Sequence, residues 1–334
     1  MSKRILGLVS LMVMLVLVVS ACGQSAPQTL TIYSGRSEEL VGPIIDQFAS
    51  ATGIKVQVRY GSTAEMAVTI LEEESNSPAD VFFAQDPGGL GAVSHLFAPI
   101  PDSILSLVEP NFRSPQGKWV GISGRARVIV YNTDKLSESD LPDDIWGFTD
   151  SQWQRRIGWA PTNGSFQAMV TAMRVMWGEE KTRQWILGIQ ANNPKVYPKN
   201  TPIVAAAGAG EIDVGFSNHY YLYRFLAEQG ETFAVRNYYL RDGGPGAVIL
   251  VAGAGILETA QNKELAARFL EFMLSPVAQQ YFAGQTFEYP VVEGVKTNRL
   301  LKPLSEINSP KIDMADLIDL KGTLSLLRET EILP

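Results

Sequence analysis

The sequence predicts an α/β protein of two lobes, in which each lobe is a mostly parallel sheet flanked by helices and the chain crosses the hinge twice. Three observations predict this fold class. The chain has 334 residues, too many for one comfortable hydrophobic core and typical of about two domains. Strands and helices alternate over residues 30–84, which indicates parallel βαβ units. Two further strands, 125–131 and 246–252, are placed to carry the chain into a second lobe and back.

The N-terminus has the features of a secreted lipoprotein. Residues 1–21 have a positive start at Lys3 and Arg4, an apolar stretch and a small-residue exit, which predict a signal peptide. Cys22 is the only cysteine and stands where a bacterial lipobox places the acylated residue, so 22–28 is predicted to be a lipidated cysteine and tether. An uncleaved membrane anchor is the alternative, but the apolar run is short for a span of roughly 20 residues. We therefore expect an extracytoplasmic protein, lipid-anchored to the bacterial cell membrane in the periplasm or on the outer face.

Charge and motif content argue against several classes of function. The formal net charge is −7 and there is no basic run, so nucleic acid is not an expected partner. The sequence has no His-Glu-x-x-His, no Gly-x-Ser-x-Gly and no phosphate-cradling Gly-rich loop with its lysine. Its two histidines, His95 and His219, are far apart, which leaves a zinc or histidine-based catalytic site poorly supplied. We do not expect an enzyme.

The first lobe is assigned to residues 29–124. Its elements are a strand at 30–33, an amphipathic helix at 38–51, an alternating strand at 54–60, a helix at 64–74 and a buried strand at 79–84. Ligands of parallel sheets lie beyond the carboxyl ends of the strands. The loops that follow these strands, 34–37, 61–62 and 85–86, are therefore candidates for one cleft.

The second lobe is assigned to residues 125–246, its return into the first lobe to 247–290, and a C-terminal segment packing mainly on the second lobe to 291–334. The expected strands are 125–131, 155–160 and 212–216, followed by the returning strand 246–252. The expected helices are 166–178, 179–190, 201–208, 219–229, 263–273, 275–283 and 314–328.

Two adjacent tyrosines, Tyr220 and Tyr221, follow the strand at 212–216 at the start of a helix for which Asn218 is a good N-cap residue. Tyrosine has a pKa of about 10 in water. Two phenols therefore act as anionic ligands near neutral pH only if a strong Lewis acid, such as a hard trivalent cation, displaces their protons. The alternative is an aromatic face of Tyr220 and Tyr223, one helical turn apart, packing on a core.

A second helix begins at Asn163, Gly164 and Ser165. Free backbone N–H groups and the helix dipole favour a bound anion at such a position. An ordinary N-cap without a ligand is the alternative, because Asn and Ser are favoured there in any case.

Eight short segments, spread over nearly the whole mature chain, match a known family in the same order. They are Tyr33-Ser34-Gly35-Arg36, Thr52-Gly53-Ile54-Lys55-Val56, Ser77-Pro78-Ala79-Asp80-Val81-Phe82-Phe83, Gly124-Arg125-Ala126-Arg127-Val128, Pro161-Thr162-Asn163-Gly164-Ser165-Phe166, Asn218-His219-Tyr220-Tyr221, Asp242-Gly243-Gly244-Pro245-Gly246-Ala247 and Glu288-Tyr289-Pro290. Each segment alone is weak, but the ordered set resembles the ferric-iron-binding, lipoprotein-type substrate-binding proteins of bacterial ABC importers. These belong to the type 2 periplasmic binding proteins.

The resemblance implies a metal site and an anion site. Tyr220 and Tyr221 match the family's paired tyrosinate ligands of ferric iron. Arg36 and Arg125 match positions that hold the anion in carbonate-binding relatives, and a guanidinium fork suits planar oxyanions; an ion pair is the alternative for each arginine. A trivalent cation with two phenolates leaves one positive charge, which a synergistic carbonate or phosphate offsets. The positions that match the anion site in part of the family are Asn163, Gly164, Ser165, Asn200 and Asn218.

The first lobe departs from the family pattern. Ser37 stands where one branch has a histidine ligand, and Gln85 where that branch has a glutamate. Phe166 replaces the third tyrosine of another branch. Glu38 and Gln85 are therefore the candidates for a first-lobe metal ligand. The alternative for Glu38 is a first-turn carboxylate that the helix dipole favours.

These features predict a monomeric solute-binding protein that captures ferric iron with a synergistic anion and delivers it to the permease of an ABC importer. Closure of the two lobes about the hinge would enclose the metal. Two alternatives stay open. One is the same fold binding an organic or oxyanion solute, such as a phosphonate or a small cationic metabolite, without iron. The other is an extracytoplasmic enzyme.

Overall fold

The structure is a computed structural model that describes residues 29–334. The predicted signal peptide, the predicted lipidation site at Cys22 and the tether lie outside the described residues. Within the described range, no helix combines the length and the apolar character needed to cross a bilayer.

The N-terminal part forms the predicted β-α-β-α-β unit. Strand β1 (Thr29–Ser34) pairs in parallel with β2 (Lys55–Tyr60) on one side and with β3 (Val81–Ala84) on the other. Helix α2 (Glu38–Thr52) begins after β1, and α3 (Thr63–Glu73) follows β2. Each of these elements begins and ends within two residues of its predicted bounds, because the period of the apolar residues defines strands and amphipathic helices well.

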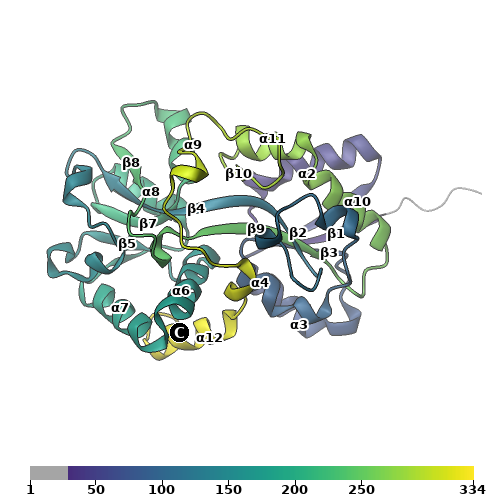
Figure 1. Ribbon diagram of the computed structural model, residues 1–334, viewed down its shortest axis with the longest axis horizontal. Coiled ribbons are helices and arrows are strands. Elements are labelled where there is room, and N and C mark those ends of the chain that lie inside the picture. The colour runs from purple at the N-terminus through teal and green to yellow at the C-terminus, as the bar shows by residue number, and fades with distance from the viewer. Residues whose placement is uncertain (1–28) are drawn as a thin grey trace, which may run out of the picture.

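Two strands join the two halves of the sheet. Strand β4 (Val120–Asn132) is buried over its whole length and is antiparallel to β9 (Ile249–Ile256). Towards its end, β4 leaves β9 and pairs instead with β7 (Val214–Asn218). Figure 1 shows β4 and β9 running side by side from one half of the molecule to the other. Both crossings are present, although β4 begins five residues before the predicted strand, and β9 begins three residues later and ends four residues later than the predicted strand 246–252, because a 3₁₀ turn occupies Pro245–Ala247.

The other half of the sheet is built around β7. Strand β5 (Ile157–Trp159) lies parallel to β7 and to β6 (Lys195–Val196), while β8 (Val235–Tyr238) pairs antiparallel with β4. The strands follow one another as β2-β1-β3-β9-β4-β7-β5-β6. The helices of this half are α6 (Gly164–Trp177), α7 (Glu179–Ala191), α8 (Asn200–Gly208) and α9 (Tyr220–Gln229).

The C-terminal segment lies against helices from both halves. The predicted helix 314–328 is interrupted: a 3₁₀ turn at Met314–Leu317 is followed by α12 (Leu320–Glu329), because the Asp319 side chain accepts a bond from Gly322 N and starts a new helix. Helix α12 contacts α6 and also α4 (Pro87–Ala92). Figure 1 shows this end of the chain beside α6 and α7.

The remaining elements are α5 (Asp102–Leu105), α10 (Lys263–Met273), α11 (Pro276–Gly284) and β10 (Tyr289–Pro290). Strand β10 pairs with β4.

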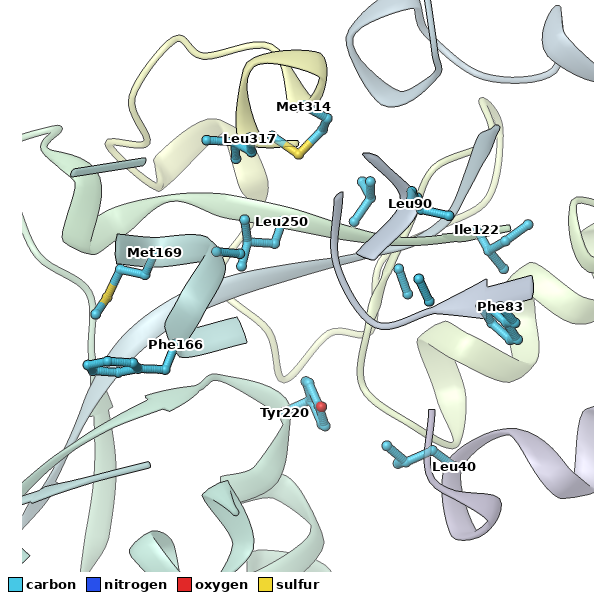
Figure 2. Packing of buried hydrophobic residues seen from close by; sticks show 14 of the residues in the cluster. Leu40, Phe83, Leu90, Ile122, Phe166, Met169, Tyr220, Leu250, Met314 and Leu317 are labelled. Atoms are coloured by element: carbon cyan, nitrogen blue, oxygen red, sulfur yellow. The ribbon is translucent and has the colours of Figure 1, made fainter. Parts of the chain in front are cut away.

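One large hydrophobic core extends through both halves. Figure 2 shows Leu250 of β9 between residues from the N-terminal half, such as Leu90, and residues of α6, such as Met169. Met314 and Leu317 of the C-terminal segment belong to the same cluster. The crossing strands are therefore part of the core, and the two halves are packed against each other.

Candidate functional site

Strand β7 continues through Asn218, and α9 begins at Tyr220 with His219 in the cap position. The expectation that Asn218 is the N-cap is therefore wrong. Pairing with Arg127 on β4 extends the strand to Asn218, whose side chain accepts a bond from Arg127 Nη1 (3.0 Å) and donates one to Ser165 Oγ (3.0 Å). This bonding places Asn218 in the interior, two residues before Tyr220.

The two tyrosines lie together in the interior. Tyr220 is fully buried, Tyr221 is 8% exposed, and their rings stack with centroids 4.2 Å apart. The Tyr220 hydroxyl lies near Arg36 and Tyr221 but makes no hydrogen bond of good geometry within the described chain. Tyr223 instead stacks on Phe287 and donates to Leu300 O (3.0 Å). The alternative of one aromatic face made by Tyr220 and Tyr223 is therefore not what the structure has.

The phenol of Tyr221 holds its proton firmly in the absence of a cation. Burial raises its pKa well above the ordinary value of 10, and Tyr220 beside it raises it further, while Arg36 and Arg125 act in the opposite direction. Figure 2 shows Tyr220 between the ribbons that carry Phe166 and Leu40, which come from opposite halves of the molecule. Tyr221 lines a cleft together with residues of both halves, whereas Tyr220 is fully buried.

His219 fixes the start of α9, and its ring lies edge-on to that of Tyr220, with centroids 5.8 Å apart. Its Nδ1 accepts a bond from Ala126 N (3.1 Å), so Nε2 carries the proton and donates to Phe287 O (2.7 Å). The ring stacks on Tyr289 at 4.7 Å, and burial lowers the pKa of His219 to about 4. The neutral imidazole thus ties α9 to β4 and to the Phe287 segment, and it positions Tyr220.

Three buried arginines face the tyrosines. Arg36 lies on the loop after β1, while Arg125 and Arg127 lie two residues apart and so on one face of β4. None of the three is more than 1% exposed. Each has two guanidinium nitrogens without a hydrogen-bond partner in the described part of the chain, namely Nε and Nη1 of Arg36, Nε and Nη1 of Arg125, and Nε and Nη2 of Arg127.

One carboxylate pairs with this arginine cluster. Glu288, fully buried, accepts bonds from Arg36 Nη2 and from Ser123 Oγ (2.5 Å). Arg125 Nη2 donates to the backbone oxygen of Gln85. A second buried carboxyl group, Asp86, acts electrostatically on Arg125 without a hydrogen bond to it. Three guanidinium groups therefore face two carboxyl groups, and the six guanidinium nitrogens without partners suit an oxyanion.

The pKa values of the three arginines depend on burial first and on neighbouring charges second. Burial lowers the pKa of Arg125, and Arg36 lowers it further. Burial and then Arg125 lower the pKa of Arg127 to about 9. For Arg36, burial acts downward, but Glu288 and the two tyrosines outweigh it, so that its pKa is raised.

Gln85 spans the space between the two halves. Its Nε2 donates to Ser165 Oγ (2.8 Å) and to Asn163 Oδ1 (3.5 Å), and Asn163 Oδ1 also accepts from Ser165 N (3.0 Å). The amide is therefore bonded to the start of α6. Neighbouring Asp86 lies against Gly164, where a Cβ would be 2.2 Å from Asp86 Oδ2.

The other predicted site residues lie apart from this cluster or without a partner. Ser37 and the exposed Glu38 line a cleft of about 580 Å³ that also reaches Tyr221. Asn200, fully buried at the start of α8, has no hydrogen-bond partner for its side chain among the residues described. Phe166 packs edge-on against Trp159 in the core. Within residues 29–334, no group of three His, Cys, Asp or Glu side chains is placed to hold a metal.

Sequence reasoning did not nominate Arg127 or Glu288 as site residues, and it included Asp86 only as part of the candidate cleft loop 85–86. The alternation of Arg125 and Arg127 in an otherwise apolar strand was the available signal, because two charges on one face of a buried strand need a partner or a ligand. Glu288 gave no such signal on its own.

The loop that carries Arg36 depends on a close approach. A Cβ on Gly35 would lie 2.2 Å from Thr63 Oγ1 and 2.8 Å from Thr63 Cα. We expect Gly35→Ala to lower the free energy of unfolding by about 1–3 kcal/mol, measured by urea denaturation, because the backbone must shift to relieve the overlap. Gly284→Ala is the control, since nothing lies within 4 Å of its Cβ position. Equal stabilities of the two variants would contradict the prediction.

Comparison with known proteins gives the family. Residues 43–307 match the family described as bacterial extracellular solute-binding protein. The chain belongs to this family. It is 33% identical over 323 residues to the Fe(3+)-binding periplasmic protein of Serratia marcescens, covering 96% of this chain and 95% of that protein.

Solved structures agree with the fold. Iron-bound HitA from Pseudomonas aeruginosa superposes on this solute-binding protein with a TM-score of 0.88 and 35% identity, covering 91% of this chain and 99% of the other. A Trichodesmium protein in complex with iron and citrate ligands gives 0.77 and 29%, with coverages of 90% and 99%. The prediction of a two-lobed type 2 periplasmic binding protein is confirmed, and the relatives are binding proteins, as the sequence analysis expected.

Proposed function

We propose that this solute-binding protein captures ferric iron between its two halves, with Tyr220 and Tyr221 as the metal ligands. The observation that carries the proposal is the meeting of two stacked, buried phenols with three buried guanidinium groups. The relatives named for ferric iron support it. Phenolate oxygens are hard donors, and a trivalent cation provides the Lewis acidity that removes their protons despite burial.

The anion completes the charge balance. Arg36 and Arg125, with Arg127 beside them, hold a synergistic oxyanion against the metal through their free N–H groups. Glu38 and Gln85, the candidates for a first-lobe ligand, contribute less: Glu38 is exposed and Gln85 is bonded to α6. The anion and water therefore supply the ligands that the first lobe lacks.

The biological role follows from this chemistry and from the N-terminus. The protein is anchored outside the cytoplasm through lipid on Cys22, works as a monomer and passes ferric iron to the permease of an ABC importer. Relatives called periplasmic iron-binding proteins support the extracytoplasmic and transport parts of this role.

The test is a visible spectrum. Iron-free protein titrated with ferric iron and bicarbonate or phosphate is expected to develop the charge-transfer colour of iron bound to phenolate. The same titration without an anion should give a weaker or slower change. If no colour develops with bicarbonate or with phosphate, the iron assignment is overturned. That result would favour the alternative, an oxyanion or organic solute held by the arginine cluster alone.

A further inference from the structure

A second cavity lies against α9, apart from the cleft that reaches Tyr221. Its volume is about 430 Å³, and among the described residues the cavity and the cleft share no lining residue. Helix α9 lies beside β8 (Figure 1), and both contribute to the lining together with the segment that follows α11. Cavities of roughly 300–1,000 Å³ are typical of small-molecule sites.

The walls of this cavity are aromatic and aliphatic. Tyr223 stacks on Phe287 with ring centroids 5.2 Å apart and planes 19° apart, and Tyr239 is a further aromatic lining residue. Leu222 and Leu226 of α9 line the cavity as well. Aromatic side chains pack well against another flat ring, either offset and stacked or edge-on. The walls therefore suit a ligand that has an aromatic ring.

Two polar atoms of the lining residues have no hydrogen bond of good geometry within the described chain. They are Asn237 Oδ1 and the Tyr239 hydroxyl, and both are covered from solvent. Asn237 donates through Nδ2 to His219 O (2.8 Å), and the nearby Tyr223 hydroxyl donates to Leu300 O (3.0 Å). A buried polar atom without a partner is unfavourable. A ligand hydroxyl group could donate to the amide oxygen and accept from the phenol, and neither atom has a bond to lose.

The charges around the cavity argue against an ionic ligand. The lining carboxylates Glu138 and Glu231 are both paired with arginines, at 3.3 and 3.0 Å. Lys302 Nζ lies 5.4 Å from the centroid of the Tyr239 ring, in the kind of position where an aromatic cage would hold a ligand cation. A cation would meet this ammonium group, and an anion would have to compete with the paired carboxylates.

We propose that this cavity is a second ligand site, which takes a small, uncharged aromatic molecule that carries a hydroxyl group. The ring packs against Tyr223, Phe287 and Tyr239. The hydroxyl group donates to Asn237 Oδ1 and accepts from the Tyr239 hydroxyl. The inference does not rest on the proposed function, because the cavity is separate from the cleft of the tyrosine pair.

Calorimetry on the iron-free protein tests the class of ligand, with phenol as the probe. We expect phenol to bind with a dissociation constant of about 1 mM, and cyclohexanol, benzoate and choline each to bind at least roughly tenfold more weakly. Cyclohexanol has the hydroxyl group without the flat ring, benzoate is an anion and choline is a cation. No binding of phenol up to about 20 mM, or binding of any of the other three as tight as that of phenol, would overturn the proposal.

Three variants test the location. Ala227→Phe fills the cavity from an exposed lining position and should weaken phenol binding by roughly tenfold or more. Tyr239→Phe removes only the hydroxyl group and should weaken it by roughly threefold or more. Tyr60→Phe is the matched control, because the same change is made in the cleft that reaches Tyr221. Unchanged phenol binding in both cavity variants, or an equal loss in Tyr60→Phe, would contradict the proposal.

Discussion

Tyr220→Phe is expected to abolish the phenolate-to-iron colour and to weaken ferric iron binding by more than roughly 100-fold. Loss of a residue that only supports a metal ligand costs up to roughly 100-fold in affinity, and loss of the ligand itself should cost more. The Tyr220 hydroxyl is buried beside Tyr221 and Arg36 and makes no good hydrogen bond in the described chain, so its removal leaves the fold little changed. The measurement is a ferric titration in bicarbonate, followed by visible absorbance and by metal analysis of the protein after gel filtration.

Tyr223→Phe is the control for this prediction. It removes a hydroxyl from the same helix, one turn further on, where it donates to Leu300 O and faces away from the arginine cluster. Its iron spectrum should match that of the unmodified protein. Retention of full colour in Tyr220→Phe, or its loss in Tyr223→Phe, would show that the metal lies elsewhere.

Glu288→Gln is expected to lower the free energy of unfolding by about 3–5 kcal/mol, as removal of one partner from a buried ion pair does. The carboxylate is the only acidic group bonded to Arg36 among the described residues, and both side chains are fully buried. Without it, Arg36 loses its only bonded carboxylate among the described residues, and Asp86, which acts on Arg125, is the one carboxyl group left near the three guanidinium groups until an anion binds. The measurement is urea denaturation of the iron-free protein.

Two comparisons make this prediction specific. Glu138→Gln breaks the exposed pair with Arg241 (3.3 Å) and should cost no more than about 1 kcal/mol. Adding bicarbonate should recover part of the loss in Glu288→Gln, because a bound anion replaces the missing charge. A loss below about 1 kcal/mol in Glu288→Gln would mean that Arg36 finds another partner in the absence of Glu288.

The order of elements was predictable because short-range periodicity determines it. Helix α10, at Lys263–Met273, has the predicted bounds, and the strands of the N-terminal half differ by one or two residues. The error at Asn218 has a long-range cause: pairing with Arg127, 91 residues away, keeps the strand going where the local sequence favours a cap. Local propensity is a weak guide wherever a neighbouring strand supplies the hydrogen bonds.

The candidate site was predictable in part. Tyr220, Tyr221, Arg36 and Arg125 lie near one another in the structure. The place of the tyrosine pair after a strand pointed to the two phenols, whereas the two arginines were nominated by the resemblance to the family. Glu288 was not, because its partners Arg36 and Ser123 are 252 and 165 residues away. The engagement of Gln85 with α6 also depends on how the two halves approach each other, which no local pattern encodes.

Strand β4 has one further consequence. Ala126 is the last residue that pairs with β9, at Ile249, and Arg127 is the first that pairs with β7, at Asn218. The two arginines, two residues apart in one strand, are therefore held by different halves of the sheet. An anion that contacts both arginines therefore links the two halves. Its binding is expected to depend on the angle between the halves, which the backbone between Arg125 and Arg127 helps to set.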